Sequence, residues 1–144
     1  MIVLDTNVVS EPLRKKPDAN VVAWLDAQVA ETLHLSTVTV AELRFGVARL
    51  PKGKRRDRLH DDLENRILPA FAGRVLPFDL AASATYAKLR AEGEVRGEQI
   101  AFADSYIAAI AIAHRFAIAT RDTRPFETAG LRVINPWQAE SNSP

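Results

Sequence analysis

Short apolar runs alternate with amphipathic stretches along this chain. Five short, mainly apolar runs are candidates for buried strands, at residues 2–4, 32–35, 74–77, 117–120 and 131–134. Between them, apolar residues recur at helical spacing, which predicts helices over about 18–29, 37–50, 54–68, 79–90 and 102–114. Strands that alternate with helices are typical of a parallel α/β sandwich. We therefore expect an α/β fold with a central parallel sheet of about five strands.

Polar residues and glycines mark the ends of several predicted helices. Ser36 and Thr37 offer N-caps for the helix after the second strand, and Asp79 caps the helix after the third. Gly93 or Gly97 closes that helix. Two shorter helical segments are expected at 6–11 and 125–129.

The composition indicates one ordinary globular domain. The chain has 144 residues, 47% of them hydrophobic and 26% charged, and it contains no repeat, linker or low-complexity segment. We expect one domain over residues 1–138 and a flexible tail at 139–144. The net charge of +1 requires any nucleic-acid surface to be local. The lack of cysteine excludes thiolate metal sites. We find neither a signal-peptide pattern nor an apolar run long enough to span a membrane. Together with the lack of cysteine, this favours a cytoplasmic location.

Four acidic residues, Asp5, Glu42, Asp104 and Asp122, lie beside apolar runs. Asp5 and Asp122 each follow a predicted strand, and ligands of parallel sheets gather at the carboxyl ends of the strands. Asp104 and Glu42 lie near the starts of helices that can reach the same edge. Carboxylates that lie close together have raised pKa values unless a cation neutralises them. We therefore expect a shared site for Mg²⁺ or Mn²⁺, which prefer hard oxygen ligands.

Each acid also has a purely structural interpretation. Glu42 completes a capping-box pattern over residues 39–42. Asp5 could cap the helix that follows it, and Asp122 could be a turn residue. Asp104 is harder to explain in this way, because an acid seldom lies unpaired in so apolar a stretch. The metal-site interpretation depends on the joint pattern.

The acidic segments resemble the motifs of a known family. Residues 1–8, MIVLDTNV, resemble the opening motif of PIN-domain proteins. The other acidic motifs of VapC-type toxins have similar stretches here, in order, at 36–43, 103–109 and 119–123. Resemblance to the FitB-like branch is carried by residues 10–14, 22–25, 67–78 and 135–137. The similarity extends from residue 1 to about 137, and every expected acidic position is occupied.

This resemblance implies a PIN-like three-layer α/β/α sandwich. It also implies the toxin of a type II toxin–antitoxin pair, a Mg²⁺- or Mn²⁺-dependent endoribonuclease that cleaves single-stranded RNA or an RNA loop. Asp5 and Asp104 would ligate the metal. Glu42 and Asp122 would complete the catalytic pocket, binding metal through water or positioning the attacking water. Residues expected to hydrogen-bond around these carboxylates are Thr6, Asn7 and Thr120.

The resemblance further implies a VapB/FitA-like antitoxin as partner. Its C-terminal segment would block the acidic pocket, often with an arginine, and its N-terminal part would bind operator DNA. The toxin would contact DNA only through this antitoxin, and would itself be a homodimer.

Basic residues near the acids and in the middle of the chain admit two interpretations. Lys54, Arg55 and Arg56 belong to a basic run that is either a solvated helix face or a patch that steers RNA phosphates. Arg121 precedes the last acid, where it either contacts the RNA strand or pairs with a nearby carboxylate.

Other functions remain as alternatives. A non-catalytic PIN-like protein could act in transcriptional regulation solely by binding a DNA-binding antitoxin, although such a scaffold has no need for all four acids. A phosphatase with an aspartyl nucleophile is disfavoured, because Asn7 occupies the position of its general acid. A receiver-type signalling domain is disfavoured because it needs paired acids after the first strand.

Overall fold

A five-stranded parallel sheet forms the centre of the protein, which we describe from a computed structural model over residues 1–138. The strand order is β3-β2-β1-β4-β5, and every neighbouring pair is parallel. The parallel α/β prediction is therefore confirmed. The expected tail at 139–144 lies outside the described residues. The strands are β1 (Ile2–Leu4), β2 (Leu33–Ser36), β3 (Val75–Leu76), β4 (Ala117–Ala119) and β5 (Val133–Ile134).

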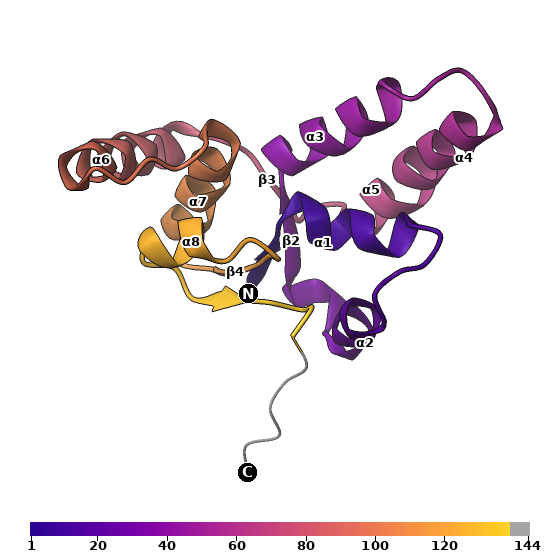
Figure 1. Ribbon diagram of the computed structural model, residues 1–144, viewed down its shortest axis with the longest axis horizontal. Coiled ribbons are helices and arrows are strands. Elements are labelled where there is room, and N and C mark those ends of the chain that lie inside the picture. Colours follow the sequence, from indigo (N-terminus) through magenta and orange to yellow (C-terminus); the bar gives the residue numbers. More distant parts are fainter. Residues whose placement is uncertain (139–144) are drawn as a thin grey trace, which may run out of the picture.

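Helices cover both faces of this sheet (Figure 1). One layer contains α6 (Leu80–Arg96), α7 (Phe102–His114) and α8 (Arg124–Thr128). The other contains α1 (Thr6–Ser10), α2 (Ala19–Ala27), α3 (Thr37–Ala48), α4 (Lys54–Asp62) and α5 (Leu68–Ala70). Short helical turns η1 (Glu11–Leu13) and η2 (Ala30–Thr32) are 3₁₀, and η3 (Leu63–Ile67) is π-helical. None of the helices in residues 1–138 combines the length and hydropathy of a membrane span.

The two layers follow from the alternation of side chains along the strands. Successive residues of a strand point to opposite faces of its sheet. In β1, Val3 belongs to the buried cluster that contains Ile107 of α7 and Phe126 of α8. Its neighbour Leu4 belongs to the cluster that contains Val8 of α1. An apolar three-residue strand thus anchors both helical layers, as expected of a three-layer sandwich.

Two of the predicted helices differ clearly from the structure, and the others agree with it to within two residues at each end. The helix that Asp79 caps continues to Arg96 instead of about Arg90, and it ends at Gly97, whose φ of +69° is left-handed. Gly93 lies inside this helix and does not close it. The helix predicted over residues 54–68 runs without a gap to Ala70, but its turn η3 is π-helical.

The carboxyl ends of β1 and β4 lie side by side. Leu4 pairs with Ala119 in the parallel register, and the backbone N–H of Asp5 donates to the Ala119 carbonyl at 2.9 Å. The residues that follow these strands, Asp5 on one and Thr120 and Asp122 on the other, therefore emerge at the same edge of the sheet.

Candidate active site

Asp5 is almost buried, with 6% of the residue exposed, directly beyond β1. Its Oδ1 accepts a hydrogen bond from the backbone N–H of Thr6 at 2.8 Å, so Asp5 caps α1 as the sequence suggested. Its Oδ2 accepts from the Thr120 hydroxyl at 2.8 Å. Burial raises the pKa of Asp5, and these two donors oppose the rise because they favour the charged carboxylate. The carboxylate is thereby held in one orientation.

Thr120 connects the two strand ends. It is fully buried, and its Oγ1 accepts from the backbone N–H of Asp122 at 3.2 Å while it donates to Asp5. The side chain of Asp122 is left exposed at the same edge. A single hydroxyl therefore fixes the spacing between an acid that follows β1 and the backbone of an acid that follows β4.

Glu42 is positioned by α1. Its Oε1 accepts from the Thr6 hydroxyl at 2.7 Å, and the same hydroxyl lies 3.2 Å from Thr39 Oγ1. The capping-box interpretation of residues 39–42 is wrong. Helix α3 begins after Ser36, whose side chain accepts from the Thr39 N–H at 3.0 Å. Glu42 therefore lies beyond the capping turn and is free to bond across to α1.

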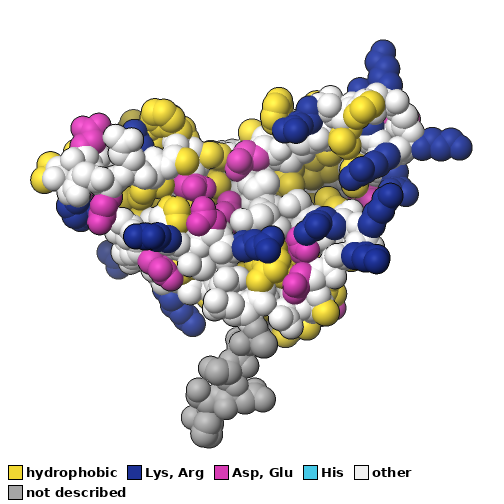
Figure 2. Space-filling model, viewed as in Figure 1, with side chains coloured by type: hydrophobic (Ala, Val, Ile, Leu, Met, Phe, Trp, Pro, Cys, Tyr) yellow, Lys and Arg dark blue, Asp and Glu magenta, His cyan; other side chains and the backbone are white. Residues whose placement is uncertain are grey.

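Asp104 shows that the four acids converge. It is half-buried in the first turn of α7. Burial raises its pKa to about 6, with further contributions from the negative charges of Asp5, Asp122 and Glu42. Because Coulomb repulsion falls with distance, these contributions require the carboxylates to lie near one another. In Figure 2, acidic side chains gather in the hollowed middle of this face. We call these four residues the acid cluster.

The acid cluster fits a hydrated divalent cation. In residues 1–138, no three Asp, Glu or His side chains are arranged closely enough to chelate one ion directly. The repulsion between Asp104 and the other three carboxylates acts over a longer distance than direct coordination of one ion. The two findings agree if water molecules fill the remaining coordination positions of the ion. Mg²⁺ commonly keeps several waters and binds through one or two carboxylates. In addition, the buried Asn7 Oδ1 has no hydrogen-bond partner among the described residues, so it needs a donor such as water.

Sequence comparison places this geometry in a family. The sequence profile of the PIN domain matches residues 2–131. The chain belongs to the PIN domain family.

Two curated relatives each match nearly the whole chain. It is 61% identical over 138 residues to VapC ribonuclease Y4jK of Sinorhizobium fredii, covering 96% of this chain and 99% of the relative. It is 55% identical over 137 residues to toxin FitB of Neisseria gonorrhoeae, covering 95% and 99%. A solved structure described as FitAB bound to an IR36 DNA fragment contains a chain that superposes with a TM-score of 0.95. That chain is 52% identical, and the match covers 99% of this chain and 100% of that one. The resemblance inferred from the acidic motifs is confirmed.

The remaining candidate residues of this PIN domain are Asn7, Arg121 and the basic residues at the start of α4. Asn7 forms no side-chain hydrogen bond to a carboxylate within the described residues. The guanidinium of Arg121 lies 5.4 Å from the centre of the Trp137 ring; it forms no ion pair within residues 1–138. The first turn of α4, on the side of the molecule remote from α7 (Figure 1), contains Lys54, Arg55 and Arg56.

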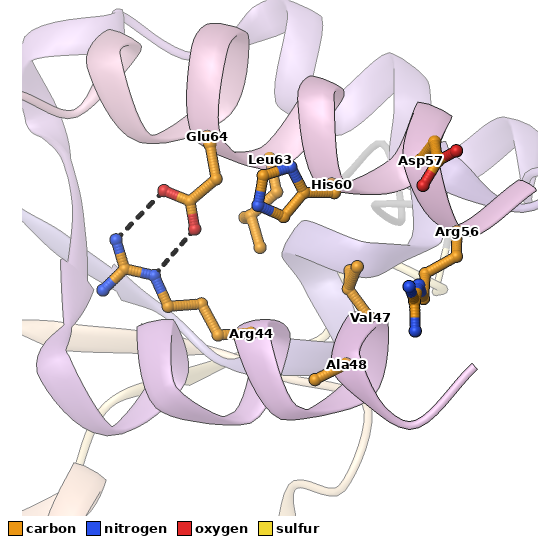
Figure 3. A pocket seen from close by; sticks show the side chains of 8 residues that line it. All are labelled: Arg44, Val47, Ala48, Arg56, Asp57, His60, Leu63 and Glu64. Atoms are coloured by element: carbon orange, nitrogen blue, oxygen red, sulfur yellow. Dashed lines mark hydrogen bonds and ion pairs between the residues drawn. The ribbon is translucent and has the colours of Figure 1, made fainter. Parts of the chain in front are cut away.

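A cavity of about 560 Å³ separates α3 from α4 (Figure 3). Arg44 and Glu64 lie at one end of it and form a two-pronged ion pair, with N–O distances of 2.8 and 3.0 Å. Arg56 lines the other end. No member of the acid cluster lines this cavity, so the basic residues of α4 and the acids occupy separate regions.

Sequence reasoning missed one residue of the site, Thr39. Its hydroxyl lies beside that of Thr6, which donates to Glu42. Residues three apart lie on the same face of a helix, so the spacing of Thr39 and Glu42 was a usable signal. It was instead interpreted as part of a capping box.

Proposed function

We propose that this PIN-domain protein is the toxin of a toxin–antitoxin pair and hydrolyses RNA phosphodiester bonds as a divalent-metal-dependent endoribonuclease. One arrangement carries the proposal: Asp5 and Asp122 follow adjacent strands, Glu42 bonds to the residue after Asp5, and the charges of all three help to raise the pKa of Asp104. So many acids at one sheet edge are costly without a cation. The names of the relatives, a VapC ribonuclease and a toxin FitB, support the same activity.

Asp5 and Asp104 would hold Mg²⁺, or Mn²⁺ in its place. When bound, such an ion lowers the pKa of a water and stabilises negative charge on a phosphoryl oxygen. Glu42 and Asp122, both exposed, would contact the metal through water or position the attacking water. Glu42 suits proton acceptance from that water, because the Thr6 hydroxyl fixes its carboxylate in place.

Three neutral residues would support these acids. Thr120 and Thr6 orient Asp5 and Glu42 through the hydrogen bonds described above. We retain Asn7 as a third supporting residue, because its unpartnered buried Oδ1 would accept a hydrogen bond from a water in the site.

Basic residues would guide the RNA. Arg121 lies one residue before Asp122 and has no carboxylate partner within the described chain, which favours contact with an RNA phosphate over an ion pair at the rim. We infer that Lys54, Arg55 and Arg56 act at longer range, attracting the RNA backbone from the start of α4.

The partner would be an antitoxin. The similar chain in the FitAB structure occurs in a complex with DNA. For the protein described here, we propose a VapB/FitA-like antitoxin that blocks the acid cluster and provides the contact with DNA. We further propose that the toxin acts as a homodimer in the cytoplasm.

The test is cleavage mapping of total RNA with wild-type protein and Asp104→Asn, each with Mg²⁺ and with a chelator. Asp26→Asn is a matched control, since it removes an equal charge from the exposed face of α2. We expect wild type and Asp26→Asn to cleave only with Mg²⁺, and folded Asp104→Asn to lose cleavage. Chelator-resistant cleavage by Asp104→Asn would contradict the proposal. An inactive wild-type protein that still binds its antitoxin would instead support the non-catalytic alternative.

A further inference from the structure

A pocket of about 340 Å³ adjoins the acid cluster. It lies between residues 98–100, which precede α7, and the start of α8. Asp122 lines this pocket and is also a member of the acid cluster. The pocket therefore continues the candidate active site on the side of β4, and its volume falls within the range of small-ligand sites.

The wall formed by residues 98–100 is held firmly against α6. The Glu98 N–H donates to the Gly93 carbonyl at 2.8 Å, and Arg90 Nη1 donates to the Ile100 carbonyl at 2.7 Å. A Cβ on Gly93 would lie only 2.7 Å from the Glu98 carbonyl oxygen, so a glycine is required for this approach. Arg96 adds an ion pair with the Glu98 carboxylate at 3.2 Å. The pocket is thus formed before any ligand binds.

The opposite wall presents a cation. Arg124 and Pro125 line the pocket at the start of α8, which is anchored by the fully buried Phe126. Arg124 is exposed, and its side chain forms no ion pair or hydrogen bond within residues 1–138. An unpaired guanidinium two residues from Asp122 is suited to a phosphate group, because its two parallel N–H groups can donate to two phosphate oxygens.

The rest of the lining suits a nucleobase. Ile100 and Pro125 offer apolar surface for the face of a ring. The Gln99 amide carries both donors and an acceptor, as needed to bind a base edge. Proteins recognise single-stranded RNA in this way, by contacting base faces and hydrogen-bonding to base edges.

We propose that this pocket binds the nucleotide next to the scissile phosphate, with Arg124 on its phosphate group and Gln99 reading its base. The inference rests on the proposed ribonuclease function and adds to it a determinant of sequence preference. It assigns the binding of the scissile phosphate to the acid cluster and the selection of the neighbouring nucleotide to the pocket.

Binding is tested first, without cleavage. The anisotropy of a labelled single-stranded RNA is titrated at several salt concentrations with Asp104→Asn protein, alone and combined with Arg124→Gln. Loss of one phosphate contact should reduce the slope of log affinity against log salt by about 0.7. Arg132→Gln removes an exposed arginine directly before β5, at the amino-terminal end of that strand, and should leave the slope unchanged.

Sequence preference is tested second, by cleavage of a random-sequence RNA pool. Gln99→Ala should relax the base preference at one position beside the cut. Active wild-type protein with an unchanged slope in Arg124→Gln and an unchanged preference in Gln99→Ala would overturn the pocket assignment alone. Unchanged RNA binding with a weakened antitoxin complex would assign the pocket to the antitoxin and also overturn it. Failure of the proposed function is distinct, because wild type itself would then not cleave.

Discussion

Replacing Asp104 by asparagine is expected to stabilise the metal-free protein even though it abolishes cleavage. The folded protein raises the pKa of Asp104 from 3.8 to about 6. A carboxyl that is less acidic in the folded state than in the unfolded state lowers folding stability once it ionises. The penalty is therefore complete above pH 6, and it disappears as the pH falls through 6 towards 3.8. Asparagine removes the charge with little change of volume.

The size of the effect follows from the pKa difference. Without screening, a rise from 3.8 to about 6 corresponds to about 3 kcal/mol. Asp104 is only half-buried, so solvent screening reduces this value, and we expect a gain of about 1–2 kcal/mol at pH 7.5. For a domain of this length, that gain raises the melting temperature by roughly 3–6 °C.

Thermal unfolding in the presence of a chelator measures this gain. Asp104→Asn should melt above wild type at pH 7.5, and most of the difference should vanish at pH 4. Asp26→Asn, on the exposed face of α2, controls for the loss of a charge. Mg²⁺ should stabilise wild type more than Asp104→Asn, because it binds the folded acid cluster. If Asp104→Asn is no more stable than Asp26→Asn at pH 7.5, or gains equally at both pH values, the carboxylates do not repel one another as described.

Three further substitutions test other parts of the structure. Thr120→Val removes the donor to Asp5 and should weaken Mg²⁺ binding by about 10–100-fold in calorimetry, whereas Thr120→Ser retains it. Equal affinity in both variants would contradict an orienting role. Gly93→Ala should displace Glu98, weakening RNA binding in anisotropy titrations while Mg²⁺ affinity is kept. RNA affinity equal to that of wild type would argue against a preformed pocket. Phe126→Ala empties a fully buried site and should cost about 3–5 kcal/mol in urea denaturation. A loss below 1 kcal/mol would contradict its anchoring role.

The sheet was predictable because its strands lie in short, mainly apolar runs. Residues 2–4 were predicted with the bounds that the structure shows, and the other strands differ by one or two residues at their ends. The edge position of Asp5 and Asp122 also followed from the sequence, since residues after parallel strands emerge at the same edge. Local pattern was sufficient in these cases because burial on both sheet faces leaves few alternatives.

Two local interpretations failed because a tertiary contact decided the outcome, although Gly97, the other predicted stop of the helix after Asp79, does end it. Gly93 looked like a helix stop, but it lies within α6 because the carbonyl of Glu98 packs against it. Glu42 matched a capping box, but its carboxylate bonds to Thr6, far away in sequence. The stacking of Arg121 on Trp137 likewise depends on the packing of separate segments. The Thr6–Glu42 and Arg121–Trp137 contacts join segments too far apart in the sequence for a local pattern to reveal them.

Direct measurement of Mn²⁺ binding tests the central claim, that carboxylates from distant segments hold a common cation. Electron paramagnetic resonance reports free Mn²⁺ during titration of wild type, Asp5→Asn, Asp104→Asn and the control Asp26→Asn. Our account predicts saturable binding to wild type and Asp26→Asn, and loss of that binding in both Asp5→Asn and Asp104→Asn. Wild-type affinity in either of the last two variants would contradict it.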